Sequence, residues 1–170
     1  MTLSNDMFGD NVLATPTDVG DNTSEGIITQ LNSLLRGEIS AAETYKQAID
    51  KVASDHVDSA KLLRGIQEEH GRAAQGIRER IQSLGGEAAD SSGAWGIWAK
   101  TVQGTMSLFG GDAGALKALK EGEEHGLKDF QDALEAVDGP TASMIANQFI
   151  PAQQRHINLL DELISTPGKA

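Results

Sequence analysis

Residues 28–52 read ITQLNSLLRGEISAAETYKQAIDKV, and this stretch decides the fold class. Its apolar side chains recur at alternating spacings of three and four residues, which is the pattern of one buried face of an α-helix. Candidate capping residues at Asn22, Thr23 and Ser24 precede it, and Glu25 suits a first helical turn. We therefore predict a long helix from about residue 22. Its inward positions are Ile28, Leu31, Leu35, position 38, Ala42, Tyr45, Ile49 and Val52.

The same spacing predicts three more long helices. The second ends at Gly85-Gly86, and the third runs from about Ala113 to Val137 and is broken by Gly139-Pro140. The fourth runs from about Thr141 to Ser165, and we expect Pro151 to kink it, since a proline ring clashes with the preceding turn. The expected inward positions of this fourth helix are Ala146, Phe149, positions 153 and 156, Leu160 and Leu163.

The connections between these helices predict how they are arranged. Short turns join the first helix to the second and the third to the fourth, whereas residues 85–112 form a far longer link. That link carries a short amphipathic helix through Trp95 and Trp98. Two antiparallel helical hairpins joined by one long crossover form a ferritin-like four-helix bundle. We predict this all-α bundle over residues 22–166, with a flexible polar leader at 1–21 and a tail at 167–170.

Composition excludes several classes of protein. With 14 Lys and Arg against 25 Asp and Glu, the net charge is −11, which disfavours binding to nucleic acid or to anionic membrane. The chain has no cysteine, so it has no disulfides and no thiolate metal ligands. An aromatic content of 4% argues against a β-sandwich or barrel. No apolar run approaches the roughly 20 residues of a membrane span, and residues 1–6 lack the start of a secretory signal, so we expect a cytoplasmic protein.

Six inward positions are polar, and they repeat along the chain. Glu38 precedes Tyr45 at the spacing at which Glu123 precedes Phe130, and a Gln-x-x-His pair occurs once in each half. The offset between the halves is 85 for the glutamates and 86 for the Gln-x-x-His pairs. The chain therefore resembles two copies of one helical hairpin related by a pseudo-two-fold axis. The six positions are Glu38, Gln67, His70, Glu123, Gln153 and His156.

These side chains suggest a metal site. Buried carboxylates destabilise a fold unless a proton, a cation or strong hydrogen bonds neutralise them. Fe, Mn or Zn could provide that cation, because carboxylate oxygens and imidazole nitrogens bind these metals. Side chains at i and i+3 of a helix point the same way, and for this reason Glu-x-x-His serves di-iron bundles. Here Gln67 and Gln153 stand where that pattern has glutamate.

Three arrangements follow from this departure. The first is a single metal held by Glu38, His70, Glu123 and His156, and the second is a weakened dinuclear site. The third is a metal-free network in which the six side chains hydrogen-bond to one another. A carboxamide is neutral and bridges metals poorly, so two carboxylates are a weak electrostatic match for two dications.

The segments Leu31–Glu38, Leu84-Gly85-Gly86 and Glu121-Gly122-Glu123, with the Trp-bearing crossover, resemble a bacterial ferritin-like family named only as a domain of unknown function. The resemblance covers residues 24–164 and implies a ferritin-like bundle without an assigned activity. It also implies kinship with the broader ferritin and rubrerythrin group. The metal ligands of that group would correspond to Glu38, His70, Glu123 and His156.

The sequence favours a non-catalytic, ferritin-like protein, related to stress by analogy with the family, whose degenerate site acts as a polar core or holds one divalent metal. One alternative is a di-iron or manganese oxidoreductase or metal-storage protein. Another is a self-associating structural protein that forms a homodimer through Trp95 and Trp98. No nucleophile–base pair and no phosphate-binding glycine loop is visible in the sequence, so we predict no catalytic residues and no organic cofactor.

Overall fold

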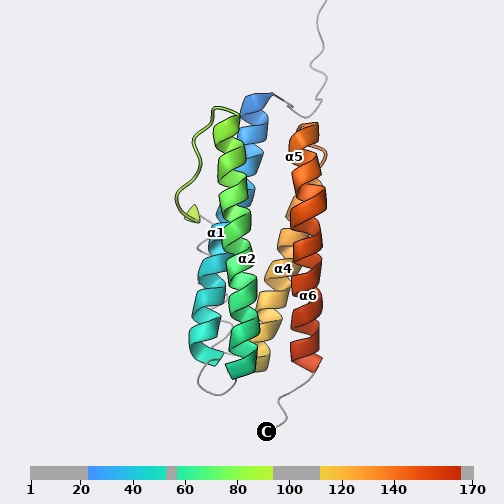
Figure 1. Cartoon of the computed structure of the whole chain (residues 1–170). Coiled ribbons are helices and arrows are strands. Elements are labelled where there is room, and N and C mark those ends of the chain that lie inside the picture. Colours follow the sequence, from blue (N-terminus) through green and yellow to red (C-terminus); the bar gives the residue numbers. More distant parts are fainter. Residues whose placement is uncertain (1–22, 53–56, 94–111, 166–170) are drawn as a thin grey trace, which may run out of the picture.

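The computed structural model describes residues 23–52, 57–93 and 112–165, and within these ranges the chain forms helices and no strands (Figure 1). The all-α prediction is confirmed for this part of the chain. The predicted leader at 1–21 and the tail at 167–170 lie outside the described residues, as does the crossover segment 94–111 with both tryptophans. The helical elements are α1 (Ser24–Val52), α2 (Val57–Ser83), α4 (Asp112–Ala133), α5 (Gly139–Met144), the π-helical turn η2 (Ile145–Phe149) and α6 (Ile150–Ser165).

The helices stand side by side as four rods, the fourth of which is α5, η2 and α6 in succession (Figure 1). α1 runs antiparallel to α2 and makes its most extensive contacts with it, and α4 packs in the same way on α6. α1 also contacts α4, while α2 and α6 touch over a smaller area. The molecule is therefore two helical pairs packed against each other.

The predicted helix ends are specified by local chemistry. At the start of α1, the Thr23 hydroxyl accepts a hydrogen bond from the Gly26 amide, as an N-capping side chain does. At the end of α2, Gly85 adopts a φ of 80°, and its amide donates to the Gln82 carbonyl, while the Gly86 amide donates to the Ile81 carbonyl. These two bonds define a Schellman C-cap, in which glycine provides the left-handed residue.

The chain after α2 lies along α1 and is held there by side-chain hydrogen bonds. Asn32 donates from Nδ2 to the Glu87 carbonyl at 2.9 Å and accepts from the Ala89 amide at 2.7 Å. Further along, the Ser92 hydroxyl donates to Glu43. The first part of the long connection is thus tied to α1 by hydrogen bonds.

The boundary between α4 and α5 differs from the prediction. α4 ends at Ala133, before the predicted end at Val137, although Val137 remains buried. Gly139-Pro140 begins the next helix instead of breaking the previous one, because Asp138 caps that helix by accepting from the Thr141 amide. Proline is well suited to a first helical turn, where its missing N–H would have no partner.

A second prediction, on the inward face of the fourth rod, is wrong. Ala146 was expected to face inward, but it is exposed, and Ile145 is buried instead. The cause is the π-helical turn η2, in which the Ile150 amide donates to the carbonyl of Ile145, five residues back. This wider turn lies just before Pro151, which has no amide to continue the ordinary α-helical ladder. Because of the extra residue in this turn, Ile145 lies on the buried face in place of Ala146.

The buried side chains form two apolar clusters separated by a polar layer. The upper cluster, in the view of Figure 1, includes Leu31, Leu35, Ile77, Ile81 and Phe130. The lower cluster includes Tyr45, Leu63, Leu116, Leu119 and Leu160. Between them lie the buried polar residues Glu38, His70, Glu123, Gln153 and His156.

Candidate metal centre

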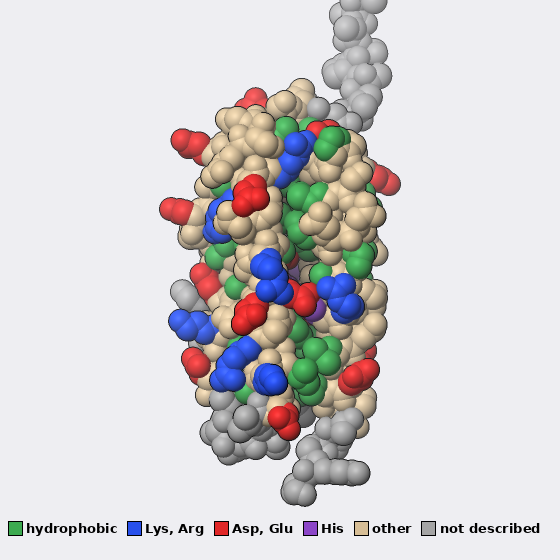
Figure 2. All heavy atoms as spheres, viewed as in Figure 1, with side chains coloured by type: hydrophobic (Ala, Val, Ile, Leu, Met, Phe, Trp, Pro, Cys, Tyr) green, Lys and Arg blue, Asp and Glu red, His purple; other side chains and the backbone are tan. Residues whose placement is uncertain are grey.

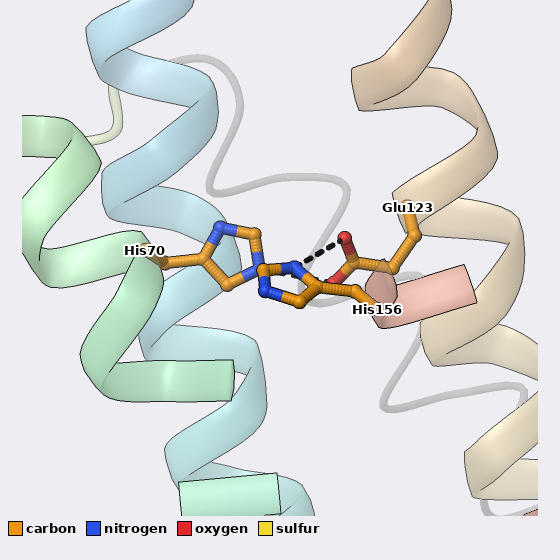
Figure 3. Close-up of side chains that lie close together, drawn as sticks. All are labelled: His70, Glu123 and His156. Carbon is orange, nitrogen blue, oxygen red and sulfur yellow. Dashed lines mark hydrogen bonds and ion pairs between the residues drawn. The ribbon is translucent and has the colours of Figure 1, made fainter. Parts of the chain in front are cut away.

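Side chains from three different helices converge in the polar layer. Figure 3 shows His70 of α2, Glu123 of α4 and His156 of α6 pointing toward one another. All three are almost fully buried, with exposed fractions between 2% and 4%. The long apolar stripes turn these residues toward the interior, since each lies on the face of its helix that packs against the other helices.

His70 bridges the two central carboxylates. Its Nδ1 lies 2.8 Å from Glu38 Oε2, and its Nε2 lies 2.9 Å from Glu123 Oε1. Because a carboxylate accepts but does not donate, both ring nitrogens donate in the metal-free arrangement. Burial alone would lower the pKa of His70, but the charges and hydrogen bonds of the two carboxylates outweigh it and raise the pKa to about 10.

Glu123 is the centre of the network. Its Oε1 also accepts from the Tyr45 hydroxyl at 2.6 Å, and its Oε2 lies 3.2 Å from His156 Nδ1. Burial favours the neutral acid, yet His70 and His156 outweigh it and lower the pKa of Glu123 to about 2. Burial and the neighbouring Glu123 raise the pKa of Tyr45, so its phenol stays protonated and donates.

His156 connects this core to the surface. Its Nε2 lies 3.1 Å from Glu69 Oε2, and Arg155 Nη2 lies 3.0 Å from the same oxygen. Glu69 is half-buried, and although burial opposes it, the contacts with His156 and Arg155 lower its pKa. Figure 2 shows acidic and basic side chains meeting over α2 and α6 at mid-height, with a histidine between them.

The two glutamines turn away from the centre of the cluster. Gln67 Nε2 donates to the Ala42 carbonyl at 3.2 Å, and Gln153 Nε2 donates to the Glu123 carbonyl at 3.1 Å. The acceptors are backbone carbonyls, so the nitrogen of each amide must face them. Both amides are therefore engaged with the backbone of the neighbouring helix.

The donor set could hold a metal ion. One ligand atom from each of His70, Glu123 and His156 lies within 4.8 Å of the others. Two imidazole nitrogens and a carboxylate suit Zn²⁺, Fe²⁺ or Mn²⁺. A pair of bridged metals would require charged carboxylates in place of the neutral amides at positions 67 and 153.

Glu38 and Glu69 lie behind the two histidines. Each contacts the ring nitrogen that is not directed at Glu123. A carboxylate in this position orients an imidazole and fixes the nitrogen that is left for a metal. Glu38, predicted as a ligand, is therefore placed where it would position His70.

Sequence reasoning identified four of the residues that meet in the layer and assigned a surface position to a fifth. Glu38, His70, Glu123 and His156 come together, whereas Gln67 and Gln153 contact the backbone beside them. The sequence places Glu69 among the surface charges, with the alternative that it rotates inward and replaces a lost ligand; in the structure it is half-buried and contacts His156. The repeat contains a clue to this contact. Glu69 precedes His70 as Arg155 precedes His156, so the two equivalent positions carry opposite charges, and they form an ion pair.

The structure defines an all-α protein with a buried His/Glu cluster that could hold a metal ion. Residues 26–136 match the family described as Domain of unknown function (DUF2383), and the chain belongs to this family. The matched region contains Glu38, His70 and Glu123 and ends before α5, so it does not include His156. The sequence matches no curated protein. In the described part of the chain, none of the helices has the length and apolar character needed to cross a bilayer.

Proposed function

We propose that this protein is a ferritin-like four-helix bundle that binds a single divalent metal ion and does not itself catalyse a reaction. His70 Nε2, His156 Nδ1 and the Glu123 carboxylate are the proposed ligands. Glu38 and Glu69 hold the two imidazoles from behind. Zn²⁺, Fe²⁺ and Mn²⁺ are the candidate ions.

One observation carries this proposal: the convergence of three buried donor atoms from three helices within 4.8 Å. Such a group is costly to bury without a partner, and a divalent ion compensates both the carboxylate charge and the desolvation of the imidazoles. The antiparallel pairs α1–α2 and α4–α6, with a long connection after α2, support the ferritin-like arrangement.

Metal content of the full-length protein tests the proposal. After expression in media supplemented with iron, manganese or zinc, elemental analysis should give about one metal ion per chain. Glu123→Gln should abolish binding, because it keeps the shape of the side chain and removes its charge. Glu124→Gln is the matched control, since the same change one residue away falls on an exposed side chain.

Restoring the missing carboxylates discriminates between one metal and two. Gln67→Glu with Gln153→Glu recreates the Glu-x-x-His pattern in both halves and should raise the stoichiometry from one ion toward two. If the wild-type chain already binds two ions, the single-metal proposal is wrong and the oxidoreductase or storage alternative gains support.

A metal-free polar layer is the second candidate function. It is favoured by the absence, among the described residues, of any buried side-chain nitrogen or oxygen without a hydrogen-bond partner. A fully satisfied network of this kind can specify how the four helices align. Metal content at background in every medium, with Glu123→Gln strongly destabilised, would establish this structural role. The cytoplasmic location, the link to stress and the homodimer through Trp95 and Trp98 stay predictions.

A further inference from the structure

A cavity of about 70 Å³ lies between α1 and α4, beside the polar layer. Its lining comes mainly from residues 33–45 of α1 and 119–130 of α4, with His70 and Gln153 at the core side. Small residues such as Gly37 and Ala41 leave the space, and Leu34, Leu119 and Phe130 give it apolar walls. Since a water needs about 10–15 Å³ and benzene fits about 150 Å³, the cavity suits a molecule of a few heavy atoms.

Glu38 presents a carboxylate oxygen to this cavity. Its Oε2 faces His70 Nδ1, and among the described residues no donor faces its Oε1. No buried side-chain oxygen in the described ranges lacks a partner, so Oε1 cannot be sealed in the core. Glu38 is one of the residues that line the cavity.

The internal repeat explains why Glu38 has a free oxygen. Tyr45, on the same helix as Glu38, donates its hydroxyl to Glu123 of the other half. The residue equivalent to Tyr45 is Phe130, which has no hydroxyl and lines the cavity. The cavity therefore lies where a second phenol would donate to Glu38.

We propose that this cavity is a binding site for a small ammonium ion, either ammonium itself or a short primary alkylammonium, whose N–H groups donate to Glu38. Glu38 is not one of the proposed metal ligands, although two of these ligands, His70 and Glu123, also line the cavity, so the proposal concerns the metal-free protein.

The charge and the walls of the cavity favour this class of ligand. Its lining contains three carboxylates, Glu38, Glu123 and Asp129, against the protonated imidazole of His70 and, among the described residues, no lysine or arginine. The chain carries a net charge of −11, which attracts cations from solution. The apolar walls suit a short alkyl group, and a pocket that is mostly apolar with a few well-placed polar groups is typical of small-molecule sites.

Ethylammonium chloride is the probe that tests the site, titrated into the ¹⁵N-labelled full-length protein in EDTA at constant ionic strength. We expect saturable amide shifts centred on residues 33–45 and 119–130. Because a ligand of so few heavy atoms gains little free energy, Kd should be no tighter than about 1 mM. EDTA removes any bound metal, so failure of the metal proposal would not affect this result.

Two neutral or oversized probes define the ligand chemistry. Ethanol has the size and a donor but no charge, and tetramethylammonium has the charge but no N–H group. Both should bind at least about tenfold more weakly, since a hydrogen bond to a charged group is worth more than one between neutral groups. Equal binding of ethanol would overturn the cationic assignment. Equal binding of tetramethylammonium would show that cations are attracted only by the negative surface charge, and this would also overturn the proposal.

Two independent variants test the location. Phe130→Tyr should bring a phenol to Glu38 and abolish binding, and Gly37→Leu should fill the cavity from α1. A Cβ at Gly37 meets no atom within 4 Å, and the same is true of Gly65 on α2, which does not line the cavity. Gly65→Leu is thus the matched control and should bind as the wild type does. Loss of binding in Gly65→Leu, or no saturation in the wild type, would overturn the proposal.

Discussion

The two helical pairs carry the same polar pattern but use it differently. In the α1–α2 pair, His70 is enclosed and contacts both central glutamates. In the α4–α6 pair, the equivalent His156 contacts only Glu123 among these two and reaches toward solvent through Glu69. The phenol of Tyr45 has no counterpart at Phe130. Repetition of a unit therefore produced an asymmetric site, with Glu123 fully engaged and Glu38 half engaged.

The asymmetry divides the roles of the two halves. The α1–α2 pair supplies the groups that hold the network together, since both its histidine and its tyrosine contact Glu123. The α4–α6 pair supplies the central carboxylate and the only histidine of the cluster that is linked to a half-exposed side chain. If the comparison is sound, equivalent substitutions in the two halves must have unequal effects.

The largest contrast should be between the two central glutamates. Glu123→Ala removes the acceptor of Tyr45 and one of the two acceptors of each histidine, whereas Glu38→Ala removes one contact of His70. We expect Glu123→Ala to lower the free energy of unfolding by about 3–5 kcal/mol, because it breaks a buried charged network at its centre. Glu38→Ala should cost about 1–3 kcal/mol. Urea unfolding in EDTA measures both, and equal losses would contradict the asymmetry.

The next contrast should appear in the pH dependence of stability, to which Glu123 of α4 and His70 of α2 contribute in different pH ranges. The pKa of Glu123 is about 2 in the folded protein and 4.5 ordinarily, so its stabilisation is present above pH 4.5 and is lost as the pH falls through 2. The pKa of His70 is about 10 instead of 6.5, so its stabilisation is complete below pH 6.5 and is lost as the pH rises through 10.

Denaturation of the metal-free protein across this pH range measures both effects. Replacement of the imidazole in His70→Gln should flatten the alkaline decline, while the exposed change Glu124→Gln should leave it in place. An unchanged alkaline decline in His70→Gln would show that the bridging histidine is not its source.

Exchanging the aromatic residues should give an intermediate effect. Tyr45→Phe removes the hydroxyl donor to Glu123 and should cost about 1–3 kcal/mol of unfolding free energy, because the acceptor is charged and buried. Phe130→Tyr places its hydroxyl beside the cavity and should change stability by less than about 1 kcal/mol. Thermal and urea unfolding measure the pair, and a greater loss in Phe130→Tyr would reverse the proposed relation of the halves.

The smallest effect is expected where the two halves meet at the surface. The Arg155 side chain is 62% exposed in its ion pair with Glu69. Arg155→Ala should therefore lower the free energy of unfolding by no more than about 1 kcal/mol, as for other exposed ion pairs. The same urea experiment applies, and a loss comparable to that of Glu123→Ala would mean that this pair belongs to the buried network.

Much of the fold could be predicted because its determinants are local. The spacing of Leu31, Leu35 and Tyr45 specified the buried face of α1, and Gly85 specified the end of α2 by its need for a positive φ. Ala146 was misassigned because the π-helical turn results from Pro151 and tertiary packing together, and spacing alone assumes regular turns. The Gly139-Pro140 pair is ambiguous in sequence, since it can end one helix or begin another.

The candidate site was predictable only in part. The repeat predicted that all six polar positions could meet in the core, because polar residues on apolar stripes must share it, and Glu38, His70, Glu123 and His156 do lie together there. It could not show which oxygen faces which nitrogen, or that both glutamines bind backbone carbonyls. The contact of Glu69 with His156 was not predicted, because it spans 87 residues and depends on how α6 is rotated against α2.

The π-helical turn also reconciles the two offsets of the repeat. Glu38 and Glu123 are 85 residues apart, as are the buried residues Ala60 and Ile145, whereas His70 and His156 are 86 apart. A one-residue insertion within Ile145–Phe149 accounts for the difference, and the wider turn absorbs it without moving the residues on either side out of phase. An alignment of the two halves should therefore place its single gap there. Deleting exposed Ala146 in a Pro151→Ala background should restore one uninterrupted α-helix.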